Sequence, residues 1–99
     1  MIVIAGSVAV RPERRDEAVR VALEMERATR AEAGCHAYRF SAALDDPATF
    51  LLFEEWESEE ALARHFASAH MAAFQQALPG LLAGPLAIKR YAVSSASGM

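Results

Sequence analysis

Two short segments of this chain are apolar on both alternating faces, and this feature constrains the fold most. Residues 2–10 are rich in β-branched side chains, which predicts a buried strand, and residues 50–53 repeat the pattern. An antiparallel sheet with one wet face alternates apolar with polar residues, so both faces of these strands need cover. Helices of the same chain can cover one face. We expect the other face to meet its equivalent on a second subunit in a two-fold homodimer.

The remaining patterns give the order of the elements. An amphipathic helix is predicted over residues 12–33, with Pro12 in its first turn and Gly34 as its C-terminal cap. The next elements are two strands of a hairpin, a pair of short helices and a last strand, predicted over residues 35–44, 49–56, 58–78 and 86–93. Turn residues 45–48 join the hairpin, and Ser58 and Ser68 are the expected helix caps.

Together these elements predict an α+β fold of the ferredoxin-like type, βαββαβ. The 99 residues suffice for one hydrophobic core, so we expect a single domain over residues 1–99. Its small polar tail, residues 94–99, is expected to fray.

Charge and cysteine content exclude several classes of partner. The net charge of −3 argues against a nucleic-acid or anionic-membrane partner, because either would need a basic patch. The apolar run at residues 2–10 is too short to span a bilayer, and its positive charges follow it, so we expect no signal peptide and a cytoplasmic location. Cys35 is the only cysteine, and we expect it to be a small buried apolar residue rather than a nucleophile.

Two histidines fall among apolar neighbours at helical spacing, which directs both inward. His65 and His70 are each either an interior histidine hydrogen-bonded to a carbonyl or hydroxyl, or a general base or ligand in a pocket. On a continuous helix they would point about 140° apart, so a shared metal would need the break at Ser68 to bring them together. No Cys, Asp or Glu stands at a convincing third-ligand position. We therefore expect no metal.

Glu54 is a second candidate for acid–base chemistry. It shares a strand face with Phe50, Leu52 and Trp56, where burial would raise the pKa of its carboxyl. The alternative is a cross-strand ion pair with Arg39, which follows if Leu44 pairs with Thr49 across the turn. No phosphate loop, Ser-His-Asp order or dinucleotide fingerprint accompanies these residues. The patterns alone therefore predict an inward-facing pocket wall and no particular reaction.

One set of residues extends over almost the whole chain with distinctive spacing. It consists of Glu32, Ala33, Gly34, Cys35, Tyr38, Asp45, residues 50–54, Glu55, Trp56, Glu60, Ala61, Leu62, His65, Ser68, Ala69 and His70. This set resembles the antibiotic biosynthesis monooxygenase (ABM) family, including its quinol monooxygenase-like proteins. The resemblance implies a dimeric α+β barrel with a hydrophobic cavity between sheet and helices in each subunit.

The resemblance also implies a reaction. Characterised members oxygenate quinol or polycyclic aromatic substrates without metal or flavin, so no cofactor is expected. A base removes a phenolic proton, and the resulting anion can itself reduce O₂ in a dry pocket. On this interpretation His65 is the base or proton shuttle, Glu54 the second catalytic candidate, and Trp56, Tyr38, Phe74 and His70 contact the substrate.

The absence of asparagine is one departure from the wider superfamily. Haem-degrading members and some polyketide oxygenases resemble each other in using a pocket asparagine, and this chain contains none. Their catalytic arrangement is therefore not expected here. Two alternatives to the monooxygenase stay open: a non-catalytic binding or stress-response module for an apolar metabolite, and an isomerase- or aldolase-like enzyme that transfers protons without oxygen.

Overall fold

A four-stranded antiparallel sheet forms one layer of the molecule. In the computed structural model, which describes residues 1–99, the strand order is β2-β3-β1-β4. The strands are β1 (Ile2–Ala9), β2 (Cys35–Ala43), β3 (Asp46–Trp56) and β4 (Ala87–Ala92). This is the predicted ferredoxin-like arrangement. β1 is a central strand and pairs with both β3 and β4.

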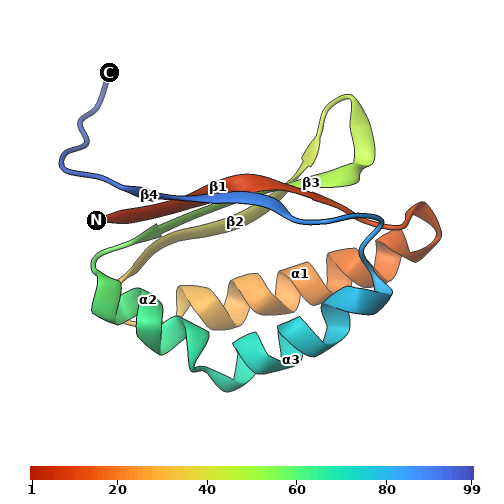
Figure 1. The fold of residues 1–99 in the computed structure, drawn as a ribbon, viewed down its shortest axis with the longest axis horizontal. Helices are drawn as coiled ribbons and strands as arrows, with labels where there is room; N and C mark the ends of the chain where they lie inside the picture. The colour runs from red at the N-terminus through yellow and green to blue at the C-terminus, as the bar shows by residue number, and fades with distance from the viewer.

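The helices form a second layer that covers one face of the sheet (Figure 1). They are α1 (Arg15–Arg30), α2 (Glu59–Phe66) and α3 (Ala69–Ala77), with short 3₁₀ turns η1 (Pro12–Arg14) and η2 (Leu78–Gly80). The predicted pair of short helices is thus confirmed, as are their caps. Ser58 Oγ accepts from the Ala61 N–H, and Ser68 Oγ accepts from the Met71 N–H, each at 3.2 Å.

The first helix ends three residues earlier than predicted. The Glu32 N–H donates to the Thr29 carbonyl at 3.0 Å, which turns the chain out of the helix after Arg30. Gly34 lies at the end of this turn with φ +83°, a left-handed conformation that favours glycine. The early ending matters because it detaches Glu32 from the helix and directs it towards α2 and α3.

The hairpin register differs from the expected one. Tyr38 lies opposite Glu54, and Arg39 lies opposite Phe53. The predicted Arg39–Glu54 ion pair is therefore wrong. The cause is a register irregularity between Ala42 and Ala43, and a shift of one residue moves every side chain to the other face.

The core lies between the sheet and the helices. Its main cluster joins inward-facing strand residues to helix residues, among them Ile2, Ile4, Leu52, Trp56, Met25 and Leu62. A second cluster at the other end of the sheet contains Val8, Val10, Ala18, Phe50 and Leu81. None of the helices combines the length and apolar character that crossing a membrane requires.

The outer face of the sheet carries no helix (Figure 1). It exposes large apolar side chains. Leu51 and Phe53 of β3 are each 44% exposed, and Tyr91 of β4 is 47% exposed. Leu51 and Phe53 belong to the outward half of the two-sided apolar pattern at residues 50–53. The homodimer stays a prediction, and this face is where a second subunit would pack.

Candidate functional site

The break between α2 and α3 places two histidines side by side. Ser68 caps α3, and its hydroxyl also donates to the His65 carbonyl at 2.7 Å, which fixes the end of one helix to the start of the next. The separation of about 140° expected for a continuous helix is thereby removed. The ring centroids of His65 and His70 lie 5.9 Å apart.

Glu32 joins the two histidines through a single oxygen. His65 Nδ1 and His70 Nε2 each lie 2.7 Å from Glu32 Oε2. A carboxylate only accepts hydrogen bonds, so both ring nitrogens that face it are donors. The other ring nitrogens, His65 Nε2 and His70 Nδ1, do not contact Glu32.

Sequence reasoning missed the role of Glu32. It lies 33 residues before His65 and 38 before His70, so no local periodicity connects it to either. Its presence in the run that resembles the ABM family was the only available signal. The expectation that no acidic residue could serve as a third ligand is corrected: ligand atoms of all three side chains lie within 4.8 Å of one another.

His65 is enclosed by aromatic rings. Its side chain is 1% exposed, and its ring centroid lies 4.7 Å from that of Trp56 and 5.7 Å from that of Tyr38. Trp56 itself is completely buried. Phe66, the last residue of α2, is 49% exposed, and its ring centroid lies 5.8 Å from that of His65.

Glu54 lies in the layer beneath these rings, in the apolar surroundings predicted for it. Its Oε1 accepts a hydrogen bond from Trp56 Nε1 at 2.8 Å, and the residue is 5% exposed. Burial raises the pKa of Glu54 to about 7; the negative charge of Glu32 acts in the same direction, and the Trp56 hydrogen bond opposes it. The expected effect of burial on this carboxyl is confirmed.

Two further groups nearby stay protonated. Burial, reinforced by Glu54, raises the pKa of the Tyr38 phenol above its ordinary value. Burial, reinforced by Glu32, raises the pKa of the Cys35 thiol, which reduces the thiolate needed for nucleophilic attack. Cys35 is half-buried, in keeping with a packing role.

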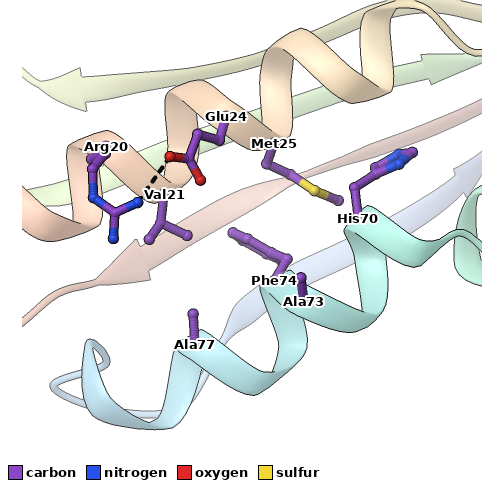
Figure 2. Close-up of a pocket in the computed structure, with 8 residues that line it drawn as sticks. All are labelled: Arg20, Val21, Glu24, Met25, His70, Ala73, Phe74 and Ala77. Atoms are coloured by element: carbon purple, nitrogen blue, oxygen red, sulfur yellow. Dashed lines mark hydrogen bonds and ion pairs between the residues drawn. The ribbon is translucent and has the colours of Figure 1, made fainter.

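A groove of about 220 Å³ runs between α1 and α3 and ends at His70. Figure 2 shows Val21 and Met25 of α1 facing Phe74 and Ala73 of α3 across it. An ion pair between Arg20 and Glu24 (2.8 Å) forms a polar rim. His70 is 27% exposed in its side chain, so it connects the buried Glu32–His65 pair to the groove.

The groove differs from the cavity that the resemblance implied. Between sheet and helices the structure leaves an apolar space of about 20 Å³, lined in part by Phe40 and Phe74. A second space of about 180 Å³ lies between α1 and the strands β2 and β3 and contains neither histidine. Trp56 and Tyr38 pack in the core and line none of these spaces, whereas His70 and Phe74 line the groove. The groove therefore brings together two of the six residues selected from the sequence.

Comparison with known proteins gives a consistent result. The sequence model described as "Antibiotic biosynthesis monooxygenase" matches residues 1–77. The chain is 32% identical over 94 residues to "Putative monooxygenase YcnE" of Bacillus subtilis, a match that covers 95% of this chain and 99% of that protein. It is 33% identical over 93 residues to the uncharacterized protein sll1783 of Synechocystis, covering 94% of this chain but 63% of the longer relative.

Solved structures with the same fold include two that share 27% of their residues with this chain. Rv0793 from Mycobacterium tuberculosis superposes with a TM-score of 0.90, covering 98% of each chain. A "putative antibiotic biosynthesis monooxygenase" from Deinococcus radiodurans superposes with a TM-score of 0.91, covering 100% of this chain and 98% of that one.

Proposed function

This chain belongs to the antibiotic biosynthesis monooxygenase family, and we propose that it oxidises a quinol-like aromatic substrate with O₂, without a metal or organic cofactor. In the proposed reaction a quinol and O₂ give a hydroxyquinone and water. One oxygen atom enters the ring and the other leaves as water. The quinol supplies all the electrons, so no external reductant is needed.

The observation that carries the proposal is the carboxylate-bridged histidine pair at the end of an apolar groove. Proton abstraction from a phenol needs a base within hydrogen-bond reach of the substrate and a dry site that favours the electron-rich anion. His70 lines the groove, and Phe74 and Met25 supply the apolar wall. Drug-sized ligands occupy roughly 300–1,000 Å³, so a groove of about 220 Å³ suits a smaller, one- or two-ring aromatic.

In this mechanism His70 is the base. Its Nε2–H donates to Glu32, which fixes the tautomer and leaves Nδ1 to accept the phenolic proton. The negative charge of Glu32 then stabilises the imidazolium. His65, hydrogen-bonded to the same oxygen, holds the carboxylate in place from the buried side and can share the charge.

The remaining sequence candidates act through these groups. Trp56 and Tyr38 pack against the His65 ring and keep water from it. Glu54 is a positioning residue in our proposal, because its hydrogen bond fixes the Trp56 indole against His65 and no groove reaches it. His65 and Glu54, the two catalytic candidates from the sequence, thus support His70 rather than touch the substrate.

Oxygen uptake on a panel of reduced quinones and anthrones tests the proposal. EDTA-treated protein should consume O₂ with at least one of them, and H70Q should lower turnover by about 10²–10⁴-fold, the range for losing a positioned base. His36, whose surface pair with Glu55 has a distance of 3.4 Å, supplies the control: H36Q should retain full activity. Tight binding without turnover would instead favour the binding module, and proton exchange without O₂ uptake the isomerase.

A further inference from the structure

The Glu32–His65–His70 cluster also has the composition of a metal-binding site. Its three ligand atoms come from three separate places in the fold: the turn after α1, the last turn of α2 and the first turn of α3. Each is a type that divalent transition metals use, imidazole nitrogen or carboxylate oxygen. The convergence is produced by tertiary structure, since Glu32 is far from both histidines in sequence.

We propose that Glu32, His65 and His70 bind one divalent first-row transition-metal cation. Two histidines and one carboxylate form the protein ligand set of many catalytic zinc sites and of non-haem iron sites. Metal–ligand bonds of about 2.0–2.2 Å place neighbouring ligand atoms roughly 3 Å apart. To admit a cation, the two 2.7 Å contacts to Glu32 Oε2 would widen, and the two histidine nitrogens, which lie within 4.8 Å of each other, would approach this spacing.

The surroundings of the cluster favour binding. His65 is held rigidly by Trp56 and by the Ser68 hydroxyl on its carbonyl, so one ligand is preorganised. Glu32 and His70 are 16% and 27% exposed in their side chains, which gives a cation an entry path from the groove side. Water can complete the coordination at the same side.

A bound cation would compete with the proposed chemistry. It would replace the protons on His65 Nδ1 and His70 Nε2 and occupy the Glu32 oxygen that orients the base. Metal binding would therefore inhibit proton transfer. This consequence rests on the proposed function, whereas the binding itself does not.

Calorimetric titration with ZnCl₂ of the whole chain, freed of metal with EDTA and then desalted, tests the inference. Wild-type protein should bind one Zn²⁺ per chain, and E32Q and H70Q should each weaken binding by about 10-fold or more. H36Q removes a histidine from an exposed His–Glu pair and should bind zinc as wild type does.

A second measurement uses the wild-type protein alone, so it tests the site even if E32Q or H70Q does not fold. Wild-type protein with CoCl₂ should develop the visible absorption of cobalt bound to nitrogen and oxygen ligands, and ZnCl₂ should abolish it. Absence of wild-type zinc binding up to about 1 mM would overturn the inference. Folded E32Q and H70Q variants that bind zinc as tightly as wild type would also overturn the inference. Because oxygen uptake is measured on EDTA-treated protein without added metal, failure of the metal site and failure of the monooxygenase are separate results.

Discussion

Glu32 is the residue on which the site depends most. It is the shared partner of His65 and His70, and its charge is the only one in contact with both rings. E32Q keeps the size of the side chain and removes the charge, so the imidazolium formed at His70 loses its stabilisation. We expect kcat for quinol oxidation to fall by about 10–100-fold, the effect typical of a group that orients a histidine. Unchanged kcat in a folded E32Q protein would remove Glu32 from the mechanism.

Glu54 makes stability depend on pH. Burial raises the pKa of its carboxyl from 4.5 to about 7, so the folded state holds this proton more tightly than the unfolded state. The contribution of the neutral Glu54 carboxyl to the free energy of unfolding is fully present below the unfolded-state pKa of 4.5. It is lost as the pH rises through the folded-state pKa of about 7. E54Q keeps an oxygen that can accept from Trp56 Nε1 and never ionises.

The raised pKa of Glu54 predicts how the stability of E54Q compares with that of wild type at different pH values. The variant should be more stable than wild type at pH 8 by up to about 3 kcal/mol, and the difference should shrink to about 1 kcal/mol at pH 5. Urea unfolding at the two pH values measures it. A difference in unfolding free energy that is the same at both pH values would show that Glu54 does not titrate in this range.

At the scale of elements, the junction between α2 and α3 controls the site. S68A removes the cap of α3 and the hydrogen bond to the His65 carbonyl. We expect a loss of about 1 kcal/mol in stability and a several-fold fall in kcat, because the two histidines lose their fixed spacing. S58A removes an equivalent cap at the far end of α2 and is the control. It should lower the melting temperature similarly and leave kcat unchanged.

Most elements could be predicted because each has its own local pattern. β1 is β-branched, and Ser58 and Ser68 are recognisable caps. The hairpin register was predicted wrongly, because β3 begins at Asp46 and not at residue 49, and an irregularity between Ala42 and Ala43 then shifts the pairing. The site was half predictable: periodicity identified the inward-facing histidines, but the carboxylate between them is brought there by tertiary structure alone.

At the scale of the whole molecule, the uncovered sheet face predicts a homodimer. Leu51 and Phe53 expose apolar surface that the helices of the same chain do not cover. Light scattering at micromolar concentration should give the mass of a dimer. The double variant L51E/F53E should be monomeric, because it would bring like charges together and bury them across a two-fold axis.

The control for the dimer is an exposed leucine on the other layer. Leu23 of α1 is 51% exposed, and L23E should leave the dimer intact. A wild-type protein that is monomeric at micromolar concentration would contradict the expectation drawn from the two-sided apolar strands. Dissociation by L23E with no effect of L51E/F53E would place the interface on the helical layer instead.

In the proposed reaction one oxygen atom of O₂ enters an aromatic substrate, and isotope labelling follows that atom. The EDTA-treated wild-type protein is supplied with ¹⁸O₂ and the reduced quinone or anthrone that supports the fastest O₂ uptake, with H70Q and H36Q in parallel, and the product is analysed by mass spectrometry. We expect one ¹⁸O atom per product molecule from wild type and H36Q, and only the slow background oxidation from H70Q. A product without ¹⁸O, or equal labelling by H70Q and wild type, would contradict the proposed reaction.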